Sequence, residues 1–151
     1  MRSTLRVLAK FFVLVMFMAS HYAIAEPATF VNSGGVALSG NDAVAYFTVK
    51  APIKGTEKFS VQHQNATYWF ASEENRATFA ADPVKYAPQY GGYCAFAASL
   101  GKKAPADPTQ WSVVDGKLYL NYDERIQKQW KADIAGFIKQ ADAKWSSIKN
   151  D

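Results

Sequence analysis

After residue 25, two side chains in this sequence are suited to chemistry at neutral pH, and the first of them is Cys94, the only cysteine. It follows Gly91-Gly92-Tyr93 and precedes a short apolar segment that predicts a helix up to Leu100. At a helix N-terminus, unpaired backbone N–H groups and the helix dipole stabilise a thiolate. Such a thiol would serve as a nucleophile, a redox sensor or a soft-metal ligand. The alternative is a small residue buried in the core, a common place for cysteine.

The second is His63, which can act as a base or as an imidazole ligand near pH 7. If His63 met Cys94 in space, the pair would form an activated thiolate or half of a metal site. One thiolate and one imidazole are few ligands for a single metal ion, whereas a homodimer would supply two of each. The alternative for His63 is a structural hydrogen bond at the end of a strand.

Three further residues are candidates for binding a ligand: Asp42, Tyr46 and Tyr93. Asp42 would add a carboxylate to a site near Cys94, or it would cap the turn that begins the apolar residues 43–47. The two tyrosines would line a pocket or belong to the core, with their hydroxyl groups hydrogen-bonded.

Several kinds of active site are disfavoured by what the sequence lacks. It has no Cys-x-x-Cys, no His-x-x-x-His, no EF-hand loop and no Gly-x-Ser-x-Gly elbow. The glycine pair at 91–92 lacks the spacing and the Lys-Ser/Thr of a phosphate-binding loop. Common hydrolases, zinc enzymes and nucleotide-binding proteins are therefore disfavoured.

The N-terminal segment predicts export. Residues 1–25 have a basic start, an apolar run over 11–19 and the small-x-small triplet Ala23-Ile24-Ala25, the pattern of a cleavable signal peptide. The apolar run is shorter than the roughly 20 residues that span a membrane. We expect the general secretory route, a periplasmic or secreted protein, and no transmembrane segment after cleavage. Residues 26–40 are expected to form a loosely packed polar leader, and residues 41–151 the domain.

Removal of the signal peptide changes the charge of the chain. The sequence has 17 Lys and Arg against 13 Asp and Glu, and residues 1–25 hold three of the bases and no acid, which leaves 14 against 13. A domain this close to neutral is not expected to bind nucleic acid.

Two hairpins and several helices should position the candidate residues. Residues 58–70 predict a hairpin with Gln64-Asn65 as the turn, so that Val61 faces Tyr68 and Phe59 faces Phe70. Residues 111–121 predict a second hairpin around Asp115-Gly116, with Val113 facing Leu118 and Trp111 facing Leu120.

Helical signals surround these hairpins. Ser72 is a good N-cap for a helix up to about Ala81, and Asp123 is a good cap for the C-terminal region. That region carries an apolar stripe at steps of three and four, with a break near Asp133 (Ile126, Trp130, Ile134, Phe137, Ile138, Ala141, Trp145, Ile148). The predicted class is α+β: two hairpins forming a small antiparallel sheet, packed by short helices and a C-terminal amphipathic helical region.

The chain also resembles the YHS-domain family, in its subgroup of short exported bacterial proteins. The resemblance rests on residues 40–47, 68–76, 88–95, 114–122 and 141–145, and so extends over nearly all of the chain after the signal peptide. It implies a small α+β module, often linked to heavy-metal handling. The presumed metal ligands of the wider family are cysteines. Here Ala45, Ala71 and Asn75 stand at those positions, and Ala43 replaces a proline.

These observations favour a non-enzymatic binding module for a soft metal such as copper or for a small ligand, with Cys94 as the anchor. One alternative is a thiol-dependent enzyme or redox sensor that uses Cys94 with His63. A structural or interaction protein is the other. The sequence leaves open whether Cys94 is reactive or buried, and whether it meets His63.

Overall fold

The chain folds into two β-hairpins, each accompanied by helices; the structure is a computed structural model that describes residues 29–150. Strands β1 (Thr56–His63) and β2 (Ala66–Phe70) form the first antiparallel hairpin, and β3 (Asp107–Val114) and β4 (Lys117–Asn121) form the second. The predicted α+β class is confirmed. The expected signal peptide, residues 1–25, lies outside the described residues.

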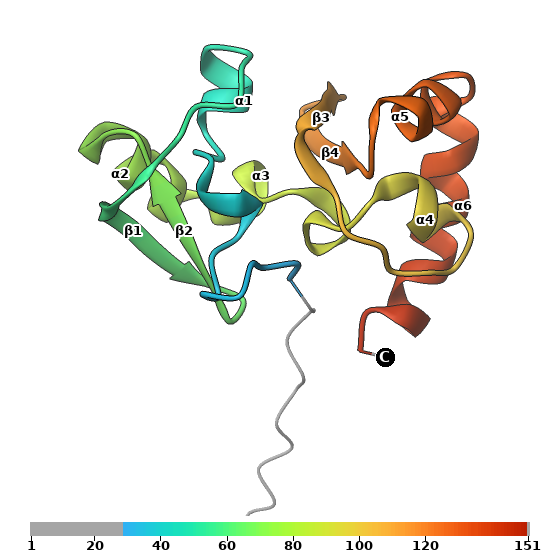
Figure 1. Ribbon diagram of the computed structural model, residues 1–151, viewed down its shortest axis with the longest axis horizontal. Helices are drawn as coiled ribbons and strands as arrows, with labels where there is room; N and C mark the ends of the chain where they lie inside the picture. The colour runs from blue at the N-terminus through green and yellow to red at the C-terminus, as the bar shows by residue number, and fades with distance from the viewer. Residues whose placement is uncertain (1–28, 151) are drawn as a thin grey trace, which may run out of the picture.

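The helices divide between the two hairpins, as Figure 1 shows. Helix α2 packs on the first hairpin, whereas α4, α5 and α6 gather around the second. In chain order the helices and 3-10 turns are η1 (Leu38–Gly40), α1 (Ala45–Thr48), α2 (Glu73–Ala81), α3 (Pro83–Tyr86), η2 (Gln89–Gly92), α4 (Ala95–Ser99), α5 (Glu124–Lys131) and α6 (Ile134–Ile148).

The hairpins form two separate two-stranded sheets rather than one sheet. Other segments occupy one edge of each hairpin. Val36 pairs with Thr67 of β2, and Cys94 pairs with Leu120 of β4. Because these edges already have partners, β2 and β4 cannot pair with each other there.

Both predicted turns are confirmed, and their backbone conformation explains them. Gln64 and Asn65 have φ of 49° and 59°, and Asp115 and Gly116 have φ of 49° and 72°. Two consecutive residues at positive φ give the turn twist that suits a two-residue hairpin. The expected pairs Val61–Tyr68, Val113–Leu118 and Trp111–Leu120 follow from these turns.

One predicted pair is wrong: Phe70 pairs with Thr56, not with Phe59. The register of the first hairpin shifts between Thr56 and Ser60. Gly55 lies directly against the backbone of Trp69 and donates its N–H to Gly40 O at 2.8 Å. This contact holds the start of β1 close to the end of β2, and the residues between Thr56 and Ser60 bulge outward.

Side-chain caps begin the helices where the sequence predicts. Ser72 accepts a hydrogen bond from Asn75 N, and Asp123 accepts one from Ile126 N. The C-terminal stripe divides into α5 and α6, and Asp133 caps α6 by accepting from Gly136 N. A Cβ on Gly136 would collide with the Asp133 carboxylate, so this glycine permits the cap.

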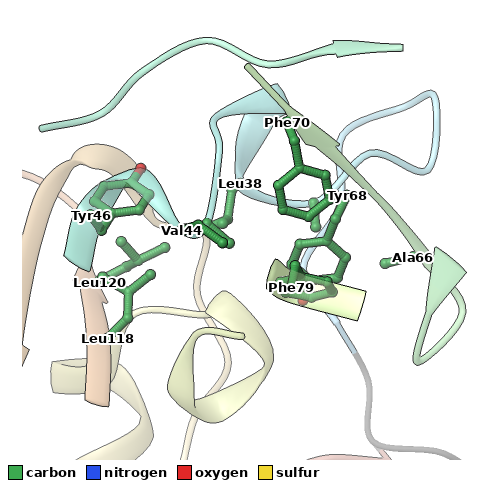
Figure 2. Packing of buried hydrophobic residues seen from close by; sticks show 11 residues of the cluster. Leu38, Val44, Tyr46, Ala66, Tyr68, Phe70, Phe79, Leu118 and Leu120 are labelled. Atoms are coloured by element: carbon green, nitrogen blue, oxygen red, sulfur yellow. The ribbon is translucent and has the colours of Figure 1, made fainter. Parts of the chain in front are cut away.

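The core joins the two hairpins (Figure 2). Tyr68 and Phe70 of β2 pack against Phe79 of α2, and Leu118 and Leu120 of β4 lie on the other side of the same cluster. In Figure 2, Leu38 and Val44 lie between these two groups. A second cluster forms around α4, α5 and α6 (Tyr90, Ala95, Ala98, Tyr119, Trp130, Ala141).

The expected leader, residues 26–40, packs more tightly than predicted over its last residues. Val36, Ala37 and Leu38 are buried, and Ala37 N donates to Thr67 O at 2.9 Å. The strand-like pairing with β2 draws these apolar side chains into the core. No helix within residues 29–150 is both long enough and apolar enough to cross a membrane.

Gly55→Ala should destabilise the protein by about 3 kcal/mol, at the upper end for overpacking. Its Cβ would lie 2.4 Å from Trp69 C and 2.6 Å from Phe70 N, and backbone atoms cannot rotate away. Urea unfolding of the variant and of the unchanged protein gives the difference in their free energies of unfolding. Gly34→Ala, on the exposed surface, is the control and should stay within about 0.5 kcal/mol of the unchanged protein. Equal effects of the two substitutions would contradict this account.

Candidate functional site

Asp42 is a fully buried carboxylate whose two oxygens accept four hydrogen bonds. Oδ1 accepts from the backbone N–H groups of Val44 and Ala45, at 2.9 and 3.2 Å. Oδ2 accepts from Ala71 N at 2.9 Å and from Asn75 Nδ2 at 2.7 Å. The carboxylate therefore joins the start of α1 to the junction between β2 and α2, which is a structural role.

Three positions that the resemblance to the YHS family aligns with cysteines, Ala45, Ala71 and Asn75, meet around this carboxylate. Ala45 and Ala71 donate through their backbone N–H groups, and Asn75 donates through its side-chain amide. Two segments far apart in the sequence, the start of α1 and the junction between β2 and α2, thus place these residues beside one acid.

Cys94 is buried, with 1% of its surface exposed, at the N-cap position of α4. Its Sγ lies 3.7 Å from Asn121 Oδ1, which also accepts from Phe96 N. Burial raises the pKa of the Cys94 thiol, and smaller contributions from backbone N–H groups oppose that shift. The direction is opposite to the lowering that the thiol-enzyme hypothesis requires.

His63 ends β1 in a different environment. Its ring packs against Tyr68 and against Phe79, with centroids 6.2 and 5.9 Å apart. The Cys94 thiol hydrogen-bonds to Asn121 of the second hairpin, whereas these ring contacts of His63 are with the first hairpin and α2. Within residues 29–150, no group of three or more His, Cys, Asp or Glu side chains is arranged to hold a metal ion.

The two candidate tyrosines, Tyr46 and Tyr93, have different neighbours. Tyr46 is fully buried in α1, donates its hydroxyl to Pro108 O at 2.9 Å, and packs edge-on against Trp111. Burial raises the pKa of Tyr46, with further contributions from Asp107 and Asp42. Tyr93 is half-buried between Phe30 and Trp145, with the Lys103 ammonium 5.6 Å from its ring centroid.

A groove of about 340 Å³ lies where three segments converge, and we refer to it as the His63 groove. The first hairpin contributes its tip, His63 and Gln64. Residues between Val84 and Gly91 form a second wall, and α6 with Lys149 just beyond its end forms the third (Asp142, Trp145, Ser146, Lys149). Of the five candidates from the sequence, only His63 lines this groove.

Tyr90 is a buried residue of the groove with a strained backbone conformation. It is 6% exposed and has φ of 54° and ψ of 37°, a left-handed conformation that is rare for an aromatic residue. Its hydroxyl donates to Asp142 Oδ1 at 2.9 Å, and its ring packs edge-on against Trp145 at 5.7 Å. Burial, the hydrogen bond to Asp142 and that residue's charge raise the pKa of Tyr90. Such backbone strain is concentrated at functional sites.

The sequence pattern assigns Trp145 to the apolar stripe and does not single out Asp142 or Lys149. The spacing of these residues in the sequence is the signal that would have indicated a shared helix face. Asp142, Trp145, Ser146 and Lys149 follow one another at steps of three, one and three residues, which places them on one face of a helix.

No family model, no curated protein and no solved structure matches this chain.

Asp42→Asn should destabilise the protein by about 3 kcal/mol, because the new amide would turn donor hydrogens toward Ala71 N and Asn75 Nδ2. Urea unfolding measures the loss. Asp82→Asn is the matched control, since Asp82 accepts only a cap hydrogen bond from Lys85 N, which an asparagine preserves. A neutral Asp42→Asn would show that the buried carboxylate is not needed.

Cys94 should resist alkylation by iodoacetamide at pH 8 until the protein unfolds, because its thiol is buried and its pKa is raised. Mass spectrometry across a urea series follows the labelling. In a Leu100→Cys variant, the new thiol replaces a side chain that is 52% exposed and should react within minutes while Cys94 stays unlabelled. Rapid labelling of Cys94 in native buffer would support the thiol-enzyme alternative.

Proposed function

We propose that this chain is an exported, YHS-like binding module that holds a small molecule in the His63 groove. The observation that carries the proposal is the convergence of three segments around a cavity of about 340 Å³ with mixed polar and apolar walls. Small-molecule sites are typically concave, of roughly 300–1,000 Å³, with apolar walls and a few well-placed polar groups.

The walls of the groove match this description. Trp145, Val84 and Pro88 supply apolar surface, and His63 and Asp142 supply polar groups. The Tyr90–Asp142 hydrogen bond and the contacts of Trp145 with Tyr90 and Tyr93 hold one wall in place before any ligand binds. A preformed site loses less conformational entropy on binding.

A function anchored on Cys94 has less support. A cysteine binds a metal ion as the thiolate, whereas burial favours the neutral thiol of Cys94. The resemblance supports the family part of the proposal, because positions 45, 71 and 75 all meet at Asp42. The same resemblance argues against metal binding of the kind implied for the wider family, since this chain has no thiol at positions 45, 71 and 75.

Two-dimensional ¹H–¹⁵N NMR of the purified protein tests the site with four probes: hexylamine, hexanoate, phenol and 6-aminohexanoate. At least one should shift the signals of the groove residues in a saturable way. Ser146→Trp should abolish the effect, because Ser146 is exposed and lines the groove, where an indole would fill the space.

Ser147→Trp is the matched control. Ser147 is the next residue, is also exposed, and does not line the groove, so binding should be unchanged. Saturable shifts around Cys94 and Asn121 instead, or no saturable shift with any probe, would overturn the proposed function.

A further inference from the structure

The charged residues of the His63 groove stand in a fixed order along α6 and just beyond it. Asp142 lies at one end and Lys149, the residue that follows α6, at the other, with Trp145 and Ser146 between them on the same face. With a rise of 1.5 Å per residue, seven residues separate the two Cα atoms by about 10 Å. The groove therefore offers a negative group, an indole and a positive group in sequence.

The acidic end has a free oxygen for a ligand. Tyr90 donates to Asp142 Oδ1, and this bond does not use Oδ2. A carboxylate accepts up to about four hydrogen bonds, so Asp142 can hold Tyr90 and a ligand ammonium together. The bond to Tyr90 also restrains the carboxylate, although Asp142 itself is exposed.

Apolar side chains line the groove beside the two charged residues, together with polar ones such as Ser146. Trp145 of α6 is one of these apolar side chains, and Val84, Ala87 and Pro88 of the second wall are others. Methylene groups placed here would lose contact with water, which favours binding by roughly 0.8 kcal/mol for each fully buried group. A small cation alone would leave Lys149 unpaired, and a small anion alone would leave Asp142 without a counter-charge.

We propose that the ligand of the His63 groove is a zwitterion whose ammonium and carboxylate are separated by an apolar spacer of several carbon atoms. The ammonium binds Asp142, the spacer lies along Trp145, and the carboxylate binds Lys149. This inference rests on the proposed function and adds the chemical class of the ligand.

The experiment measures Kd by the same NMR titration for glycine, 6-aminohexanoate, hexylamine and hexanoate. The charges of 6-aminohexanoate are about 7 Å apart, given bond lengths near 1.5 Å. It should bind up to about fivefold more tightly than hexylamine or hexanoate, since each of these lacks one of two exposed ion pairs. Glycine, with adjacent charges, should bind more weakly still.

Charge-neutral variants test each end separately. Asp142→Asn keeps an acceptor for Tyr90 and should reduce the affinity for 6-aminohexanoate to that for hexanoate. Lys149→Gln should reduce it to that for hexylamine. Asp115→Asn and Lys139→Gln, both exposed and outside the groove, are the matched controls and should leave Kd unchanged.

The outcomes separate the two proposals. If hexylamine, hexanoate or phenol shifts the groove signals and 6-aminohexanoate has no advantage, the zwitterion inference is overturned and the proposed function stands. An advantage that survives both Asp142→Asn and Lys149→Gln also overturns the inference. If no probe shifts the groove signals, both proposals fail.

Discussion

A single buried carboxylate sets the geometry on which the rest of the structure depends. Asp42 is withdrawn from water, and a buried charge of this kind is tolerated only when hydrogen bonds replace its hydration. Its four donors come from the start of α1 and from the junction between β2 and α2. Helix α1 in turn carries Tyr46, whose hydroxyl reaches β3 at Pro108. The first hairpin is thereby connected to the second, and the His63 groove lies between the tip of one and the long helix that accompanies the other.

The parts of the fold that the sequence predicts are those determined by neighbouring residues. Turn residues at positive φ and acidic or hydroxyl caps act over two to four positions, so both turns, the caps at Ser72 and Asp123 and the break near Asp133 follow from local patterns. The pairing of Phe70 with Thr56 does not, because it depends on Gly55 meeting Trp69 across the hairpin. The separation of the two sheets likewise depends on Val36 and Cys94, which reach the strand edges from elsewhere in the chain.

The candidate site is less accessible to sequence reasoning, for a related reason. Rare residue types direct attention to Cys94 and His63, yet rarity says nothing about burial. The thiol is enclosed beside Asn121, and the imidazole lies at the groove. The residues that give the groove its charge order are common ones on a helix whose apolar stripe already explains Trp145 as core. Only the folded chain shows that Tyr90, from a strained turn, meets Asp142 on that same helix.

The central claim is that ligand binding takes place at the His63 groove and not at Cys94. A crystal structure of the protein soaked in 6-aminohexanoate tests it most directly. The account predicts electron density for the ligand along Trp145, with its nitrogen within hydrogen-bonding distance of Asp142 and its carboxylate toward Lys149. Density at Cys94 and Asn121 instead, or an empty groove at saturating ligand with the groove open to solvent in the crystal, would contradict it.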